Sequence, residues 1–270
     1  MTRLMLFLTL MILALGACRT ARGLQPEDIP THASVEDMAT ALPLTQNAPP
    51  APYDRPVTRF DRVDNLLNEL VGWRYVVQLE FEGEFAETGQ EANASARAEV
   101  WFNQVADARR VVVATSGEMI GQAEDSTYEA VRLGPDAFLI RDGACQSNAS
   151  QAAVTAASLN AGELIGGVTE AVPAGRRAVI NGEEVYLYAF ERDNLVLPSI
   201  RARDNGQVML TSGEMWIAPS RNAVVRFYLN LDVENVVIFD RQLPVSGQVV
   251  IRYDLYDISV ENNITVPFGC

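Results

Sequence analysis

The 270-residue sequence contains a single histidine and three cysteines, and this scarcity excludes most catalytic and metal-binding arrangements. A Ser-His-Asp or Cys-His arrangement needs a histidine base beside its nucleophile, yet His32 stands alone in a proline-rich segment. No cysteine pair has zinc-ligand spacing, and no glycine-rich loop has the spacing and the lysine of a phosphate-binding loop. We therefore expect no enzyme, no cofactor and no metal. A carboxylate pair of the glycosidase kind stays open as a distant alternative.

Positive charge is also scarce. Lys and Arg total 21 against 35 Asp and Glu, which gives a formal net charge of −14. The basic residues form no cluster, and this argues against nucleic acid and against attraction to anionic lipid head groups. We interpret the acidity as a source of solubility.

The N-terminus carries a short hydrophobic run that ends at the first cysteine. Arg3 precedes Leu4–Ala17, in which Thr9 is the one polar residue. The run is shorter than the roughly 20 apolar residues that span a bilayer, and it is typical of a signal peptide. Its last residues, Leu15-Gly16-Ala17-Cys18, resemble a bacterial lipobox.

The lipobox resemblance implies that residues 1–17 are cleaved and that the Cys18 thiol carries diacylglycerol, with palmitate-like acyl chains as the membrane anchor. Two chains hold a protein stably at a bilayer, whereas one binds marginally. The protein would then be extracytoplasmic, at the bacterial cell membrane. Arg19 replaces the aspartate of the usual inner-membrane retention signal, so the outer membrane is expected where a cell has one. The alternative is an ordinary secretory signal or an uncleaved anchor.

Composition divides the remaining chain into a tether and a domain. Residues 18–57 are rich in Pro, Ala, Thr and Gln and have little hydrophobic periodicity, which predicts a flexible tether. Residues 58–270 are long enough for one domain with a real core, and no hydrophobic run after Cys18 would cross a membrane.

Two cysteines remain once Cys18 carries lipid. An even number of cysteines in an exported domain favours a disulfide, here between Cys145 and Cys270. Two free thiols stay open as the alternative, because a sequence does not give the distance between them.

Hydrophobic spacing predicts mostly strands. Residues 58–71 have helical spacing, and the alanine-rich residues 148–165 predict a second helix. Strict alternation elsewhere predicts antiparallel strands, with turns at Asn181-Gly182 and at residues 204–206. The strands are expected at 73–87, 96–105, 109–119, 126–134, 136–143, 176–180, 183–191, 199–203, 207–218, 222–235 and 247–261.

About ten long strands, mostly consecutive, indicate an α+β fold that is mostly β. A sheet this wide curls, and its apolar face needs a cover. We therefore expect a strongly curved antiparallel sheet, an unclosed β-barrel, over the two or so helices. The row Glu80, Glu82 and Glu84 is interpreted as the solvated outer face, because side chains in a row along a strand do not converge on a calcium ion.

The inner face of this sheet is the candidate ligand site. Two short helices leave volume unfilled under a wide sheet, although a plain packed core is the equal alternative. The residues expected to line the cavity are Val77, Leu79, Phe81, Phe85, Phe102, Val225, Phe227, Leu229, Leu231 and Tyr253.

The whole arrangement resembles the LolA/LppX-type bacterial lipoproteins. The resemblance rests on the lipobox, the tether, the order of helices and strands, and Gly175…Asn181-Gly182 followed by "EEVYLYAFE". It implies an unclosed barrel over helices that carries lipid or acyl chains in its hollow. We therefore expect a membrane-anchored, lipid-binding lipoprotein. The alternative is a cell-envelope sensing or protein-interaction lipoprotein with a filled core and no ligand.

Replacing Cys18 with serine should release the protein from membranes or block its processing, because the thiol that carries the lipid is lost. Cell fractionation, with mass measurement of the N-terminus, tests this. Unchanged membrane retention with normal processing would contradict the lipobox assignment.

Overall fold

The computed structural model describes residues 58–117, 126–141, 143–146, 151–239 and 243–270. All of these belong to one compact unit, residues 52–270. The predicted signal peptide, Cys18 and the tether lie outside the described residues.

The described residues form a 13-stranded sheet in which neighbouring strands pair antiparallel. The strand order is β1-β8-β9-β11-β12-β13-β2-β3-β4-β5-β6-β7, and β10 pairs with β8. The strands are β1 (Thr58–Phe60), β2 (Gly72–Phe85), β3 (Glu91–Asn103), β4 (Ala108–Ser116), β5 (Ser126–Leu133), β6 (Asp136–Arg141), β7 (Ala144–Gln146), β8 (Gly167–Ile180), β9 (Glu183–Ala189), β10 (Leu195–Val196), β11 (Ile200–Ala218), β12 (Ala223–Ile238) and β13 (Val245–Tyr256).

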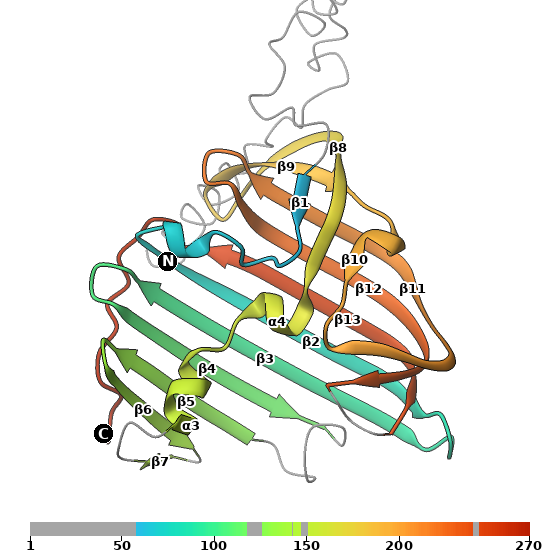
Figure 1. Cartoon of the computed structure of the whole chain (residues 1–270), viewed down its shortest axis with the longest axis horizontal. Coiled ribbons are helices and arrows are strands. Elements are labelled where there is room, and N and C mark those ends of the chain that lie inside the picture. Colours follow the sequence, from blue (N-terminus) through green and yellow to red (C-terminus); the bar gives the residue numbers. More distant parts are fainter. Residues whose placement is uncertain (1–57, 118–125, 142, 147–150, 240–242) are drawn as a thin grey trace, which may run out of the picture. The chain divides into compact units, whose positions relative to one another are not determined.

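The sheet stays open, because β1 and β7 stand at the two ends of the strand order and do not pair with each other. This confirms the predicted unclosed antiparallel architecture. Figure 1 shows β11 to β6 side by side, with β8, β1 and the helices across one face. That face is mostly apolar along β12, β13, β2 and β3, since alternation turns every second side chain toward it.

The covering helices are short. The predicted helix at 148–165 is present as α3 (Gln151–Ala157) and α4 (Ala161–Ile165), and residues 158–160 interrupt it. Ala153 and Ala157 of α3 pack on Ala130, Ala137 and Leu139 of the sheet. Small side chains on both surfaces allow this close approach.

The predicted helix at 58–71 is wrong. Thr58 and Phe60 pair with β8, and Leu66 has a left-handed backbone (φ 68°) that stops helical propagation. The helical part is the short 3-10 helix η1 (Leu67–Glu69). Of the residues with helical spacing, Phe60, Val63 and Leu67 are buried in an irregular segment, Leu70 is half-buried and Leu66 is exposed.

The two predicted turns have different outcomes. Asn181 and Gly182 both have positive φ and join β8 to β9 as a two-residue hairpin, as predicted. The turn at 204–206 is wrong, since β11 runs unbroken through it. The register with β12 shifts there, and Asn235 of β12 donates from Nδ2 to the Asp204 carbonyl. The extra residues form a bulge.

Residues 257–270, here called the strap, follow β13 without regular structure. Its Ser259 amide donates to Gly72 O, and its Asn262 side chain donates to the carbonyls of Trp73 and Phe102. Figure 1 shows it running along the strand ends to the β6–β7 side. There the Cys145–Cys270 disulfide closes it, with a Cα–Cα distance of 5.5 Å. The strap therefore ties the middle of the sheet to one end.

Changing both Cys145 and Cys270 to alanine should lower the free energy of unfolding by about 5 kcal/mol, because the bridge closes a loop between residues 125 apart. Urea unfolding of the variant and of the wild type, with and without reductant, measures this. The reduced wild type should match the variant. An equal midpoint in all four samples would show that the bond does not constrain the unfolded chain.

Candidate functional site

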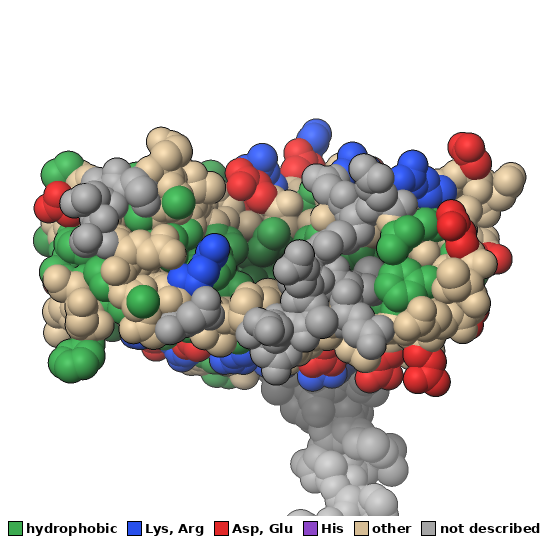
Figure 2. Space-filling model, turned by 90° about the horizontal axis from the view of Figure 1, so that it is seen from below, with side chains coloured by type: hydrophobic (Ala, Val, Ile, Leu, Met, Phe, Trp, Pro, Cys, Tyr) green, Lys and Arg blue, Asp and Glu red, His purple; other side chains and the backbone are tan. Residues whose placement is uncertain are grey.

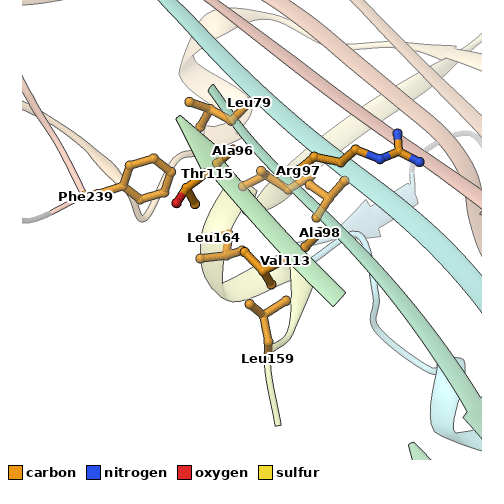
Figure 3. Close-up of a pocket in the computed structure, with 11 residues that line it drawn as sticks. Leu79, Ala96, Arg97, Ala98, Val113, Thr115, Leu159, Leu164 and Phe239 are labelled. Atoms are coloured by element: carbon orange, nitrogen blue, oxygen red, sulfur yellow. The ribbon is translucent and has the colours of Figure 1, made fainter. Parts of the chain in front are cut away.

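An apolar cavity of about 220 Å³ lies between the inner face of the sheet and the segment around α4. Figure 3 shows its lining residues, and Figure 2 shows hydrophobic side chains in a recess between charged rims. The lining residues are Val77, Leu79, Ala96, Arg97, Ala98, Val113, Thr115, Leu159, Leu164, Ile165 and Phe239.

Two cross-strand rows make the floor of the cavity. Strand register places Val77, Ala98 and Val113 side by side across β2, β3 and β4. The next row consists of Leu79, Ala96 and Thr115. The middle strand thus contributes alanines between larger neighbours, and the space that their small side chains leave is the apolar cavity. The Arg97 side chain points away from it (Figure 3).

The opposite wall comes from outside the sheet. Leu164 and Ile165 belong to α4, and Leu159 lies in the break before it. Phe239 follows β12 with a left-handed backbone (φ 53°), and its amide donates to the Ser199 carbonyl. A bulky residue in this conformation is strained, so the surrounding structure must hold it there.

The predicted cavity residues divide into three groups. Val77 and Leu79 line the cavity. Phe85 is partly exposed at the end of β2. The others are buried elsewhere in the core, where aromatic rings pack together: Tyr253 lies 5.4 Å from Tyr75, and Phe227 lies 5.8 Å from Phe190, between ring centroids. These buried residues are Phe81, Phe102, Val225, Phe227, Leu229, Leu231 and Tyr253.

A second, polar hollow of about 170 Å³ lies near the strand ends, next to the loop before β2. Its most buried charged group is Arg109 of β4, which is 7% exposed. Arg109 was not among the predicted site residues, although alternation with Val111 and Val113 places it on the inner face. The lining residues are Arg62, Asp64, Asn65, Leu66, Leu67, Asn68, Trp73, Arg109 and Asn160.

Arg109 is held by neutral groups. Its Nη2 donates to the Leu159 carbonyl, to Asn160 Oδ1 at 3.2 Å and to the Tyr75 hydroxyl at 3.5 Å. Its guanidinium lies 5.3 Å from the Trp73 ring centroid. Tyr75 also accepts from the Ala161 amide, so Tyr75 and Arg109 together fix the break between α3 and α4.

Comparison with known proteins gives distant likenesses only. No family model matches the chain, and no curated protein matches it. LprF from Mycobacterium bovis is similar over 77% of this chain and 93% of its own, with 12% identity and a TM-score of 0.37. A LolA superfamily protein from Nitrosomonas europaea covers 75% and 95%, with 12% identity and a TM-score of 0.22.

The name of the second protein includes LolA, one of the lipoprotein groups that the sequence resembles. TM-scores this low carry no argument about the site. The cavity and the hollow are therefore interpreted from the side chains of this chain alone.

Neither a metal site nor a membrane helix is found in the described part of the chain. No group of three or more His, Cys, Asp and Glu side chains there could hold a metal ion. No helix among the same residues is long and apolar enough to cross a bilayer. Glu80, Glu82 and Glu84 are exposed on the outer face.

Burial shifts the pKa values of two charged side chains in the polar hollow. Desolvation lowers the pKa of Arg109, although Tyr75 and Asp64 counteract it. Desolvation raises the pKa of Asp64, against a hydrogen bond from the Gly162 amide and the charges of Arg109 and Arg62. An added Cβ on Gly162 would lie 2.3 Å from Asp64 Oδ1, so only glycine allows this contact.

Asp64→Asn should change how stability depends on pH. A raised pKa in the folded state means that folding favours the protonated acid, so this group costs stability as pH rises above about 4, its unfolded value. Asparagine can still accept from Gly162 without ionising. Wild type should therefore lose stability relative to the variant between acid and neutral pH, as measured by urea unfolding. Parallel curves would contradict this.

Proposed function

We propose that the protein is a lipid-anchored lipoprotein of the bacterial cell envelope that binds or carries an apolar ligand, a lipid or acyl chain, in the apolar cavity. The observation that carries the proposal is the lining of that cavity. Its floor of Val77, Ala98 and Val113 leaves space where a packed core would have a large side chain. A cavity with such walls favours hydrocarbon over water.

The size of the cavity limits what it can hold. About 220 Å³ accommodates about seven groups of the size of a water molecule or a methylene. Burying seven methylenes contributes about 6 kcal/mol before the cost of association is subtracted. The cavity therefore takes one short chain, or the end of a longer one.

The chemistry of the lining supports binding. Thr115 contributes the one hydroxyl among the described lining residues, and these residues include no histidine and no carboxylate. A nucleophile without a base nearby does not form an acyl-transfer site. The same lining offers an acyl chain dispersion contacts with the floor and the opposite wall.

Native mass spectrometry of the full chain purified from cells tests the proposal. A co-purifying lipid that is absent after delipidation, together with uptake of a fluorescent fatty acid, supports the carrier. Ligand-free protein that takes up no fatty acid contradicts it. In that case the sensing or protein-interaction lipoprotein with a filled core is the better description.

Ala98→Phe should abolish most fatty-acid uptake, because the ring occupies the floor of the cavity between Val77 and Val113. Ala114→Phe, on the exposed outer face of β4, is the matched control and should leave uptake unchanged. Fluorescence titration gives the affinity, and thermal unfolding confirms that both variants fold. Equal uptake by the two variants would place the ligand elsewhere.

A further inference from the structure

The polar hollow and the apolar cavity are neighbours on the inner face of the sheet. Thr115, Val113, Val111 and Arg109 point the same way along β4, so Arg109 lies about 13 Å along the strand from the cavity floor at Val113. Leu159 lines the cavity, and its carbonyl accepts from Arg109. The residues Leu159 and Asn160 therefore stand between the two spaces.

Arg109 has no close ion-pair partner among the described residues, although the charge of Asp64, which lines the same hollow, favours its protonated form. No carboxylate of the described chain lies within 4.0 Å of it, and its Nε is buried without a hydrogen-bond partner. Arg132 is its cross-strand neighbour and adds a second positive charge. A buried charge is costly unless it is paired, so an anion in the hollow would give Arg109 the close partner that no described carboxylate provides.

The other walls of the hollow suit an anion. Asn160 and Arg62 line it, and Arg62 pairs with Glu163 at 3.3 Å where both side chains are about half exposed. That surface pair is weak, so Arg62 can turn to a ligand. Asp64 also lines the hollow and opposes an anion when it is ionised, and burial raises the pKa of this carboxyl.

The lining of the polar hollow also contains a residue with a strained backbone. Leu66 lines the hollow with a left-handed backbone (φ 68°), which a leucine rarely adopts. The Leu67 carbonyl behind it accepts from Trp73 Nε1 at 2.9 Å, which fixes the loop. Strained residues held by their surroundings gather at binding sites.

We propose that the polar hollow is a binding site for a carboxylate or phosphate group, with Arg109 as its principal partner. A guanidinium has the planar donors that match these oxygens, and the sequence contains no lysine that could take the role. The anion is either the acidic head group of the ligand whose chain occupies the cavity, or a free anion. Only the first source rests on the proposed function.

Three probes separate these sources on residues 52–270, which form one compact unit with its own core and disulfide. Dodecanoate has chain and charge, dodecanol has the chain alone, and inorganic phosphate has the charge alone. For a head-group site, wild type should bind dodecanoate at least tenfold more tightly than dodecanol. Arg109→Gln should bring this ratio to about one while dodecanol binding stays unchanged.

Two further variants serve as a matched control and as a second test of the site. Arg110→Gln is the matched control, because Arg110 points to the outer face and pairs with Glu129. It should behave as wild type. Arg62→Gln, at the exposed rim, should lower the preference for dodecanoate over dodecanol roughly threefold. Because Arg62 is exposed, this variant tests the anion site even if Arg109→Gln does not fold.

The outcomes distinguish this proposal from the carrier function. If phosphate raises the wild-type unfolding midpoint and not that of Arg109→Gln, while dodecanol does not bind, the anion site stands and the carrier function fails. If dodecanol binds but neither dodecanoate nor phosphate responds to Arg109→Gln, the carrier function stands and the anion site is overturned. Equal losses in Arg109→Gln and Arg110→Gln also overturn it.

Discussion

The structure depends on one constraint: the apolar inner face of the sheet is larger than the helices and loops that cover it. The described strands form a wide antiparallel sheet whose second face is polar. The α-helices on the inner face, α3 and α4, have seven and five residues. Parts of the inner face therefore pack against aromatic side chains of the sheet itself, and one part, over β2, β3 and β4, keeps a cavity. The apolar cavity follows from this mismatch between the area of the sheet and the length of the chain that covers it.

Two polar side chains decide where that cover sits. Tyr75 and Arg109 are the groups of the sheet that bond to the break between α3 and α4. They place Leu159 at the edge of the apolar cavity and Asn160 in the polar hollow. The same hydrogen bonds thus define a boundary between an environment for hydrocarbon and one for charge. This makes the inner face amphipathic along β4, with Arg109 at one end and Val111 and Val113 further along.

Alternation along single strands made most of the sheet predictable, because a period of two is a local signal. The bounds expected for β2, β12 and β13 lie within a few residues of those found. The helix expected at 58–71 failed because the spacing of Phe60, Val63 and Leu67 reports burial and not backbone geometry. Of the ten residues expected to line a ligand cavity, Val77 and Leu79 lie in the wall of the apolar cavity, and their role in binding stays a prediction. Leu159, Leu164 and Phe239 could not be found, since the pairing of a loop with a distant strand leaves no local pattern.

The two strands at the ends of the open sheet, β1 and β7, have three residues each, whereas most of the strands between them are much longer. An exposed edge offers its free amides and carbonyls to any other strand, and a long edge is a template for aggregation. Here each terminal strand offers room for only a few such bonds, and the disulfide at Cys145 fastens the strap beside β7. At the β7 end the sheet therefore offers few free bonds to a further chain, whereas β8 beyond Ala171 pairs with β9 alone and keeps an open edge.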